Sequence, residues 1–219
     1  MAKVALLHTA EVHVATFRRL LEELAPEAEQ SHVVHADWLA EAREGGLTAP
    51  LRERVTGFLA DQAAANDAVL CTCSTLGPLA DELARERGNV LRIDRPLMQR
   101  AAEHDGTILV ALCLESTLAP TLDLLGAAFA EKGRPLDHRV ALCREAWPRF
   151  EAGDMEAFGR AIADEVRDAC RGLEHCGCVV LAQASMAVAE AHLADLGVPV
   201  YSSPRLAAEA LVAAVCSTD

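Results

Sequence analysis

Cys73 is the residue whose type and position could do chemistry most directly. It opens the run Cys73-Ser74-Thr75, which follows the apolar stretch Ala68-Val69-Leu70 and predicts a turn from a strand into a helix. A thiol at a helix N-terminus feels the positive end of the macrodipole, which favours the thiolate. A thiolate with a pKa near neutrality is a competent general base, and its protonated form is a general acid. The alternative is that Cys73 is only a small residue in a tight turn.

A second segment repeats this turn without the thiol. The stretch Val179-Val180-Leu181 leads into Ala184-Ser185-Met186, so a methyl group stands where the first copy has its sulfur. An enzyme with a thiol in both copies could move a proton on either face of a substrate carbon. This sequence predicts a thiol on one face only.

Other polar residues follow the predicted strands at the same edge. In open parallel sheets, ligands bind beyond the carboxyl ends of the strands, where helix N-termini point. Two such edges facing each other would enclose a small cleft of hydroxyl and backbone N–H donors, which suits a carboxylate. A planar enediolate-like charge needs such fixed donors, each worth on the order of 3 kcal/mol. The candidate substrate contacts are His8, Thr9, Ser74, Thr75, Ser116, Thr117, Gln183, Ser185 and Met186.

Two of these candidates carry open alternatives. His8 could act as a second acid or base or orient a carboxylate, and it could equally be a capping or hydrogen-bonded histidine. Gln183 could donate to a ligand, or it could simply satisfy the hydrogen bonds of a neighbouring turn.

Strand-like apolar runs alternate with helix-period segments along the chain, which predicts a parallel α/β fold. In the first half we expect strands near 4–7, 32–34, 68–70 and 90–93 and helices over the regions 17–24, 51–59 and 76–87. In the second half we expect strands near 110–112, 179–181 and 198–200, and a helix capped by Asp154. The final helix, from about Arg205, is expected to pack on the first half.

The order of landmarks repeats once along the chain. Val110-Ala111-Leu112 repeats Val4-Ala5-Leu6, Leu181 repeats Leu70, and Gly197–Val200 repeats Gly88–Leu91, each at an offset of about 110 residues. We therefore predict two pseudo-symmetric parallel-sheet α/β domains related by internal duplication, with the active-site cleft between them. The expected boundaries are 1–95 plus 205–219 for the first half and 96–204 for the second.

Composition excludes several classes of partner. The chain has 219 residues, 52% of them hydrophobic, and a formal net charge of -13 without a basic run, which argues against nucleic acid and anionic membranes as partners. Its N-terminal apolar run is too short for a signal sequence, and Glu115, Pro120 and Asp123 interrupt the most apolar longer stretch. These features predict a cytoplasmic protein.

The eight cysteines are then expected to be thiols rather than disulfides. The pairs Cys71/Cys73 and Cys176/Cys178 have one residue between them, whereas the paired ligands of structural zinc sites usually have two to four, so we expect no metal site. We read the run His175–Cys178 as a helix exit that precedes a strand. Four further cysteines, with apolar neighbours, are expected to be core residues: Cys113, Cys143, Cys170 and Cys216.

Taken in order, these segments resemble the aspartate/glutamate racemase superfamily, which includes hydantoin racemases, maleate isomerases and arylmalonate decarboxylase. Cys73-Ser74-Thr75 is similar to the family's Cys-Asn-Thr type of turn, and Glu115-Ser116-Thr117 to its hydroxyl-rich loop. Gly153-Asp154 and Val180–Ala187 are similar to a less characterised branch of the superfamily. The resemblance covers nearly the whole chain, and its strength lies in the order and spacing of motifs that are individually weak.

The resemblance implies a cofactor-independent enzyme with a small carboxylate-bearing substrate, and a homodimer or higher homo-oligomer. Members with two cysteines remove a proton next to a carboxylate with one thiolate and return it from the other. Here the first position falls on Cys73 and the second on Ala184, which implies a racemase- or isomerase-like enzyme with a single acid/base thiol.

Three alternatives stand beside that reading. The first is a one-sided decarboxylase of the arylmalonate type, although the single cysteine of that enzyme lies in the opposite half. The second is a non-catalytic protein that binds a small carboxylate. The third is a thiol-redox protein using Cys71 and Cys73, which is disfavoured because their side chains are expected to point apart.

Overall fold

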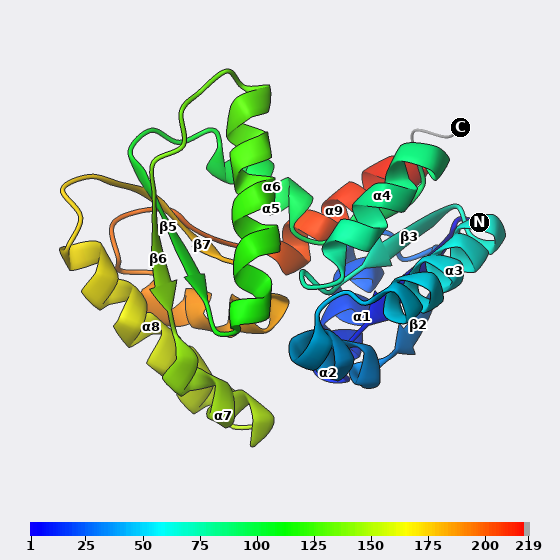
Figure 1. The fold of residues 1–219 in the computed structure, drawn as a ribbon, viewed down its shortest axis with the longest axis horizontal. Helices are drawn as coiled ribbons and strands as arrows, with labels where there is room; N and C mark the ends of the chain where they lie inside the picture. The colour runs from blue at the N-terminus through cyan, green and yellow to red at the C-terminus, as the bar shows by residue number, and fades with distance from the viewer. Residues whose placement is uncertain (217–219) are drawn as a thin grey trace. The chain divides into compact units, whose positions relative to one another are not determined.

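The computed structural model describes residues 1–216 and divides the chain into two compact units (Figure 1). The first unit comprises residues 1–93 together with the chain from 204 onward, and the second comprises residues 94–203. Each unit contains its own four-stranded sheet and its own buried core.

The first unit is built on a parallel sheet of order β2-β1-β3-β4. Its strands are β1 (Lys3–His8), β2 (Glu29–Val34), β3 (Ala68–Cys71) and β4 (Val90–Arg92). Its helices are α1 (Val12–Leu24), α2 (Ala36–Gly45), α3 (Ala49–Ala65), α4 (Gly77–Arg87) and α9, which begins at Ser203 and ends at Cys216.

Alternation along the strands assigns residues to the two faces of this sheet. Ala5 and Leu7 of β1, with Val69 and Cys71 of β3, pack in one cluster with α2, α3 and α4. Cys73 belongs to the same cluster, so the prediction that the side chains of Cys71 and Cys73 point apart was wrong, because residues i and i+2 of an extended segment share a face. In this unit α9 is joined to α1 by an ion pair in which Arg205 donates to Glu23 at 2.9 Å.

The second unit repeats the strand order as β6-β5-β7-β8, again fully parallel. Its strands are β5 (Thr107–Leu112), β6 (His138–Leu142), β7 (Cys176–Leu181) and β8 (Val200–Ser202). Its α-helices are α5 (Arg95–Ala101), α6 (Leu118–Glu131), α7 (Trp147–Glu151) and α8 (Met155–Arg171), and its 3₁₀ helices are η1 (Glu115–Thr117), η2 (Arg144–Ala146) and η3 (Ala184–Leu193).

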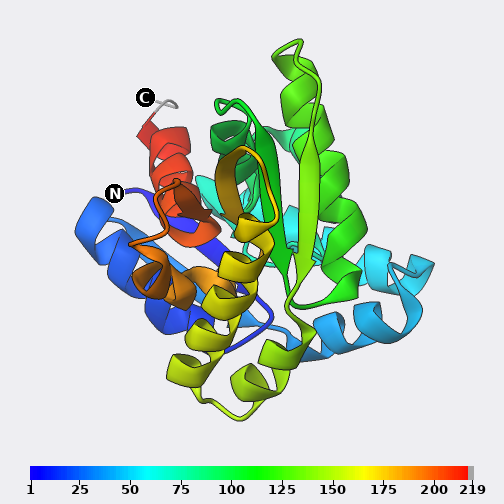
Figure 2. The ribbon, with the colours of Figure 1, turned by 90° about the vertical axis from the view of Figure 1, so that its left-hand side faces the viewer.

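In this unit α8 and α6 lie on opposite sides of β5 (Figures 1 and 2). Phe158, Ile162 and Val166 of α8 pack with Leu109 and Ala111 of β5. The sequence prediction of a parallel α/β fold with two similar halves is therefore confirmed. The predicted cap of α8 is also confirmed, because Asp154 Oδ1 accepts the N–H of Ala157 at 3.0 Å.

Several local predictions were wrong or incomplete. Strand β2 begins at Glu29 rather than at His32. The run Glu29-Gln30-Ser31 is polar and did not indicate a strand, but an edge strand tolerates polar residues. Cys216 is exposed rather than a core residue, and Cys170 is only half-buried. Cys176 and Cys178 do not precede a strand but lie within β7.

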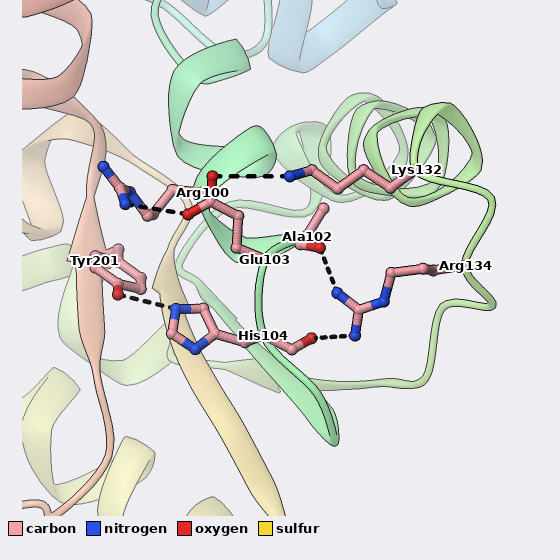
Figure 3. Close-up of polar contacts among 7 residues, drawn as sticks. All are labelled: Arg100, Ala102, Glu103, His104, Lys132, Arg134 and Tyr201. Carbon is pink, nitrogen blue, oxygen red and sulfur yellow. Dashed lines mark hydrogen bonds and ion pairs between the residues drawn. The ribbon is translucent and has the colours of Figure 1, made fainter.

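One polar cluster fixes the turn between α5 and β5, residues 102–106 (Figure 3). Arg134 donates to the carbonyl oxygens of Ala102 at 2.6 Å and His104 at 2.8 Å, and it pairs with the Asp105 carboxylate. An arginine at a helix C-terminus satisfies carbonyl groups that have no partner within the helix. We call this segment the α5–β5 turn. Among the helices of residues 1–216, none is both long and apolar enough to cross a membrane.

Candidate active site

The first unit places Cys73 just beyond the carboxyl end of β3, two residues after the last strand residue. Its side chain is buried, as are those of Ser74 and Thr75, and the three open the turn that leads to α4. The helix begins at Gly77, so Cys73 stands before the first helical turn rather than within it. The Gly77 N–H donates to the Ser74 carbonyl at 3.2 Å and closes this turn.

His8 ends β1, beside this turn in the sheet order, and both of its ring nitrogens are engaged. Nδ1 lies 2.8 Å from Thr72 Oγ1, and Nε2 lies 2.9 Å from Nδ1 of His32. The Thr72 hydroxyl itself donates to the Leu7 carbonyl at 3.0 Å. His8 Nδ1 therefore carries a hydrogen and donates to Thr72, since that oxygen's own hydrogen is already used.

The electrostatics agree with this chain of hydrogen bonds. Burial, with smaller contributions from His32 and His13, lowers the pKa of His8 to about 3, and burial lowers the pKa of His13 to about 4. At neutral pH His8 is thus an uncharged ring whose Nε2 accepts from His32. These contacts favour the alternative of a hydrogen-bonded histidine. His8 holds Thr72, which is the residue directly before Cys73.

A buried cation lies at the start of α4. The Arg92 guanidinium, from β4, lies so close to Gly77 that a Cβ there would be 2.8 Å from its nitrogen. The same group donates to Asp81 at 2.7 Å, one turn further along α4. Burial of a charge is costly unless it is paired, and this pair fastens the first two turns of α4 to the sheet.

At the corresponding edge of the second unit, Gln183 follows β7 and connects it to the loop after β5. Its Oε1 accepts the N–H groups of Cys113 at 2.5 Å and Leu114 at 3.2 Å. The Gln183 oxygen therefore satisfies a neighbouring turn, which is the second of the two alternatives that the sequence left open for this residue.

The loop after β5 brings three hydroxyl groups to the start of α6. Thr117 is buried, and so is Thr121, one turn into the helix. The hydroxyl oxygens of Ser116 and Thr121 are buried without a hydrogen-bond partner. A buried hydroxyl without a partner is costly. Of the two, Ser116 is the one that lies at the predicted substrate edge, whereas Thr121 is fully enclosed.

Ala184, Ser185 and Met186 begin η3 rather than a regular α-helix. Ser185 is buried near the strand end, whereas Met186 packs in the core of the unit. The Met186 N–H already donates to the Gln183 carbonyl at 2.9 Å, so Met186 supports the turn.

Sequence reasoning missed Thr72, Arg92 and Thr121. Arg92 had a signal, since it is a cation within the apolar run Val90–Ile93. Thr72 and Thr121 had none, because one hydroxyl among apolar neighbours is common. In residues 1–216, no three His, Cys, Asp or Glu side chains are grouped so that they could hold a metal ion.

Two parallel sheets of this topology define a fold class: the chain has the fold of solved glutamate and aspartate racemases. No protein-family model matches the sequence, and no curated protein matches it. The likeness is therefore one of structure.

Three solved structures illustrate it. A glutamate racemase isoform from Bacillus anthracis is 15% identical, with a TM-score of 0.74, over 99% of this chain and 82% of its own. An allantoin racemase from Klebsiella pneumoniae is 17% identical, with a TM-score of 0.65, over 100% of this chain and 89% of its own. An arylmalonate decarboxylase is 13% identical, with a TM-score of 0.59, over 97% of this chain and 92% of its own.

Proposed function

We propose that this protein is a cofactor-independent enzyme that handles a proton at the carbon next to a carboxylate of a small molecule. Cys73 is the acid/base thiol, and hydroxyl and backbone donors at the strand ends hold the carboxylate. The observation that carries this proposal is the position of Cys73, buried in the turn after the third strand of a racemase-like sheet. Its counterpart after β7 is Ala184, so the enzyme has one thiol for proton transfer.

Proton transfer by Cys73 proceeds in two directions. As a thiolate it takes the proton from the α-carbon, and the developing negative charge passes to the carboxylate, where fixed hydrogen-bond donors stabilise it. As a thiol it returns a proton to the same face. Such an enzyme exchanges the α-hydrogen with solvent while retaining configuration, unless another group serves the opposite face.

One-sided decarboxylation is the second candidate activity. Loss of CO2 from a malonate also produces an enediolate-like species, and one thiol is enough to protonate it on one face. The presence of a single thiol favours this reaction over symmetrical racemisation, and an arylmalonate decarboxylase is among the structures with this fold. A protein that only binds a carboxylate is the third candidate, favoured by the alanine at position 184.

Proton NMR in D2O distinguishes the three. The protein is incubated with amino acids, hydantoins, malonates and maleate, and the α-hydrogen signal and CO2 release are followed with time. We expect native protein to introduce deuterium or release CO2 with at least one class, and Cys73→Ala to lower that rate by about 10²- to 10⁴-fold.

The matched control is Cys71→Ala, which removes the buried thiol two residues earlier, from the same apolar cluster as Cys73. This variant should retain the native rate to within a few-fold. Equal rates in native protein and Cys73→Ala would refute the assignment of Cys73. Ligand-dependent thermal stabilisation of both proteins without turnover would instead establish the binding protein.

A further inference from the structure

Two thiols of the second unit lie together at the start of β7, the end of the strand opposite to Gln183. The Cys170 thiol, in the last turn of α8, donates to the Cys176 sulfur across 3.9 Å. The Cys176 thiol in turn donates to the Cys178 carbonyl at 3.7 Å. Both sulfurs belong to half-buried residues, and they would need to approach by only about 2 Å to reach bonding distance.

A β-bulge directs Cys176 toward Cys170. In a regular strand Cys176 and Cys178 would share a face. Here Thr107 pairs with Cys176 and Ile108 with Cys178, so Gly177 is an extra residue in β7. Cys176 consequently packs with Val179 and Leu181 on the α8 side, and Cys178 is buried outside that cluster.

The bulge is enforced by close packing. A Cβ at Gly177 would lie 2.1 Å from the carbonyl oxygen of Asp105, so only glycine fits there. Asp105 belongs to the α5–β5 turn, whose carbonyl groups Arg134 holds in place (Figure 3). The α5–β5 turn, which Arg134 holds in place, thus fixes the bulge at Gly177 and with it the orientation of Cys176.

The remaining cysteines of this unit have different surroundings. Cys113, Cys143 and Cys178 are buried, and burial raises the pKa of each, to about 12 for Cys143 and Cys178. Only Cys170 and Cys176 combine a neighbouring sulfur with partial exposure among the cysteines of residues 94–203.

We propose that Cys170 and Cys176 form a thiol–disulfide exchange site whose reactant is a small disulfide. The Cys176 thiolate attacks one sulfur of the reactant, the reactant's S–S bond breaks, and one small thiolate leaves. Cys170 then gives up its proton and attacks the Cys176 sulfur, and the second small thiolate leaves. Two protein thiols are oxidised to one disulfide, and the reactant is reduced to two thiols, which take the two protons.

Cys176 is the first nucleophile for an electrostatic reason. Burial raises its pKa, but hydrogen bonds from Cys170 and from the backbone of Leu109 act in the opposite direction. Burial and the adjacent Cys176 raise the pKa of Cys170 to about 12. The attack of Cys176 on the small disulfide should therefore be slow at neutral pH. Cys170, whose sulfur lies 3.9 Å away, then attacks Cys176 and resolves the mixed disulfide.

Peptide mapping tests the proposal directly. Folded, reduced protein is incubated with oxidised glutathione, quenched with acid and digested with trypsin without reduction. Cleavage after Arg167, Arg171 and Arg205 separates Cys170, in 168–171, from Cys176 and Cys178, in 172–205. We expect the two peptides to be joined, with a mass about 2 Da below the sum of the reduced peptides.

Two variants identify the sulfur that is used. Cys176→Ala should abolish the cross-link, whereas Cys178→Ala, which changes the residue two positions along the same strand, should retain it. The exposed Cys216 reports whether the reagent is active, because it should acquire glutathione in every sample. A modified Cys216 without the cross-link in folded native protein would overturn the proposal, as would a cross-link that survives in Cys176→Ala.

This site does not depend on the activity proposed for Cys73. Cys170→Ala should lose the cross-link and keep any exchange at a substrate α-carbon, so the two proposals can fail separately.

Discussion

The two units share a strand order and differ in the segment that comes after the third strand. In the first unit, β3 leads through Cys73 to the α-helix α4; in the second, β7 leads through Ala184 to the 3₁₀ helix η3. The register extends the comparison, because Arg92 pairs with Cys71 at the end of β4 and Ser202 pairs with Leu181 at the end of β8. The first edge thus has a thiol and a buried cation where the second has a methyl group and a hydroxyl.

Under the proposed function, the two repeated edges have separate tasks. The first edge holds the proposed acid/base thiol Cys73, while the Arg92–Asp81 ion pair fixes the start of α4 and the hydrogen-bonded His8 fixes Thr72. The second edge carries the hydroxyl groups of Ser116 and Thr117, which are the donors proposed to hold the carboxylate. Each element of this contrast can be altered separately.

The largest expected effect comes from adding the missing thiol. Ala184→Cys should let a second face of the substrate exchange, so that a product of one configuration becomes a racemate. The reason is the two-thiol mechanism of the superfamily that the chain resembles. Chiral chromatography of the product measures it, with Ala187→Cys as the control because that alanine lies in the same 3₁₀ helix with similar burial. A racemate from both variants would show that position 184 has no special role.

The buried cation gives the next largest effect. Gly77→Ala would place a Cβ 2.8 Å from the Arg92 guanidinium, which must shift relative to Asp81 and weaken that ion pair. We expect a loss of about 3 kcal/mol in the free energy of unfolding, measured by urea denaturation. Gly57→Ala is the matched control, since nothing lies within 4 Å of the new Cβ in α3, and it should stabilise by about 0.5 to 1 kcal/mol. Equal effects of the two substitutions would contradict the role assigned to Arg92.

The sequence predicts those differences between the two units that depend on neighbouring residues, and it does not predict those that depend on contacts between residues far apart in the chain. Apolar runs reveal the strands, and their ends reveal Cys73 and Ala184, because strand periodicity is local. The position of Arg92 against Gly77 and the use of Gln183 by the β5 loop require the tertiary structure. The bulge at Gly177 was equally hidden, since it results from contact with Asp105 across the sheet. The sequence predicts which residues lie at the carboxyl edge of a sheet. The tertiary structure determines which of their polar groups already form hydrogen bonds within the protein.

Buried histidines should make the stability of the protein depend on pH. The folded pKa of His8 is lowered to about 3 from 6.5, so the unfolded chain binds the proton more readily. Stability from this residue is therefore complete above about pH 6.5 and is lost as the pH falls toward 3, by about 2 kcal/mol between pH 7.5 and pH 5. His13 should add a similar loss, because its pKa is also lowered, to about 4.

Urea midpoints at the two pH values measure this dependence. His8→Asn keeps a donor toward Thr72 but cannot be protonated, and it should reduce the loss by about 2 kcal/mol. His138→Asn, an exposed position of the second unit, should leave the dependence unchanged. A native protein equally stable at pH 5 and pH 7.5 would show that His8 is not buried as a neutral ring.

The smallest effect concerns how each unit starts a helix. Asp154 caps α8 with its side chain, whereas α4 begins without a side-chain cap and is held instead by Arg92 against Gly77 and Asp81. Asp154→Ala should therefore cost about 1 kcal/mol, and Asp154→Asn, which keeps the acceptor oxygen, only a few tenths. Hydrogen exchange localises the change: the first turn of α8 should lose protection while α4 keeps its own. Loss of protection in both helices would mean that the two units unfold as one, and the contrast between their helix starts would then have no separate energetic meaning.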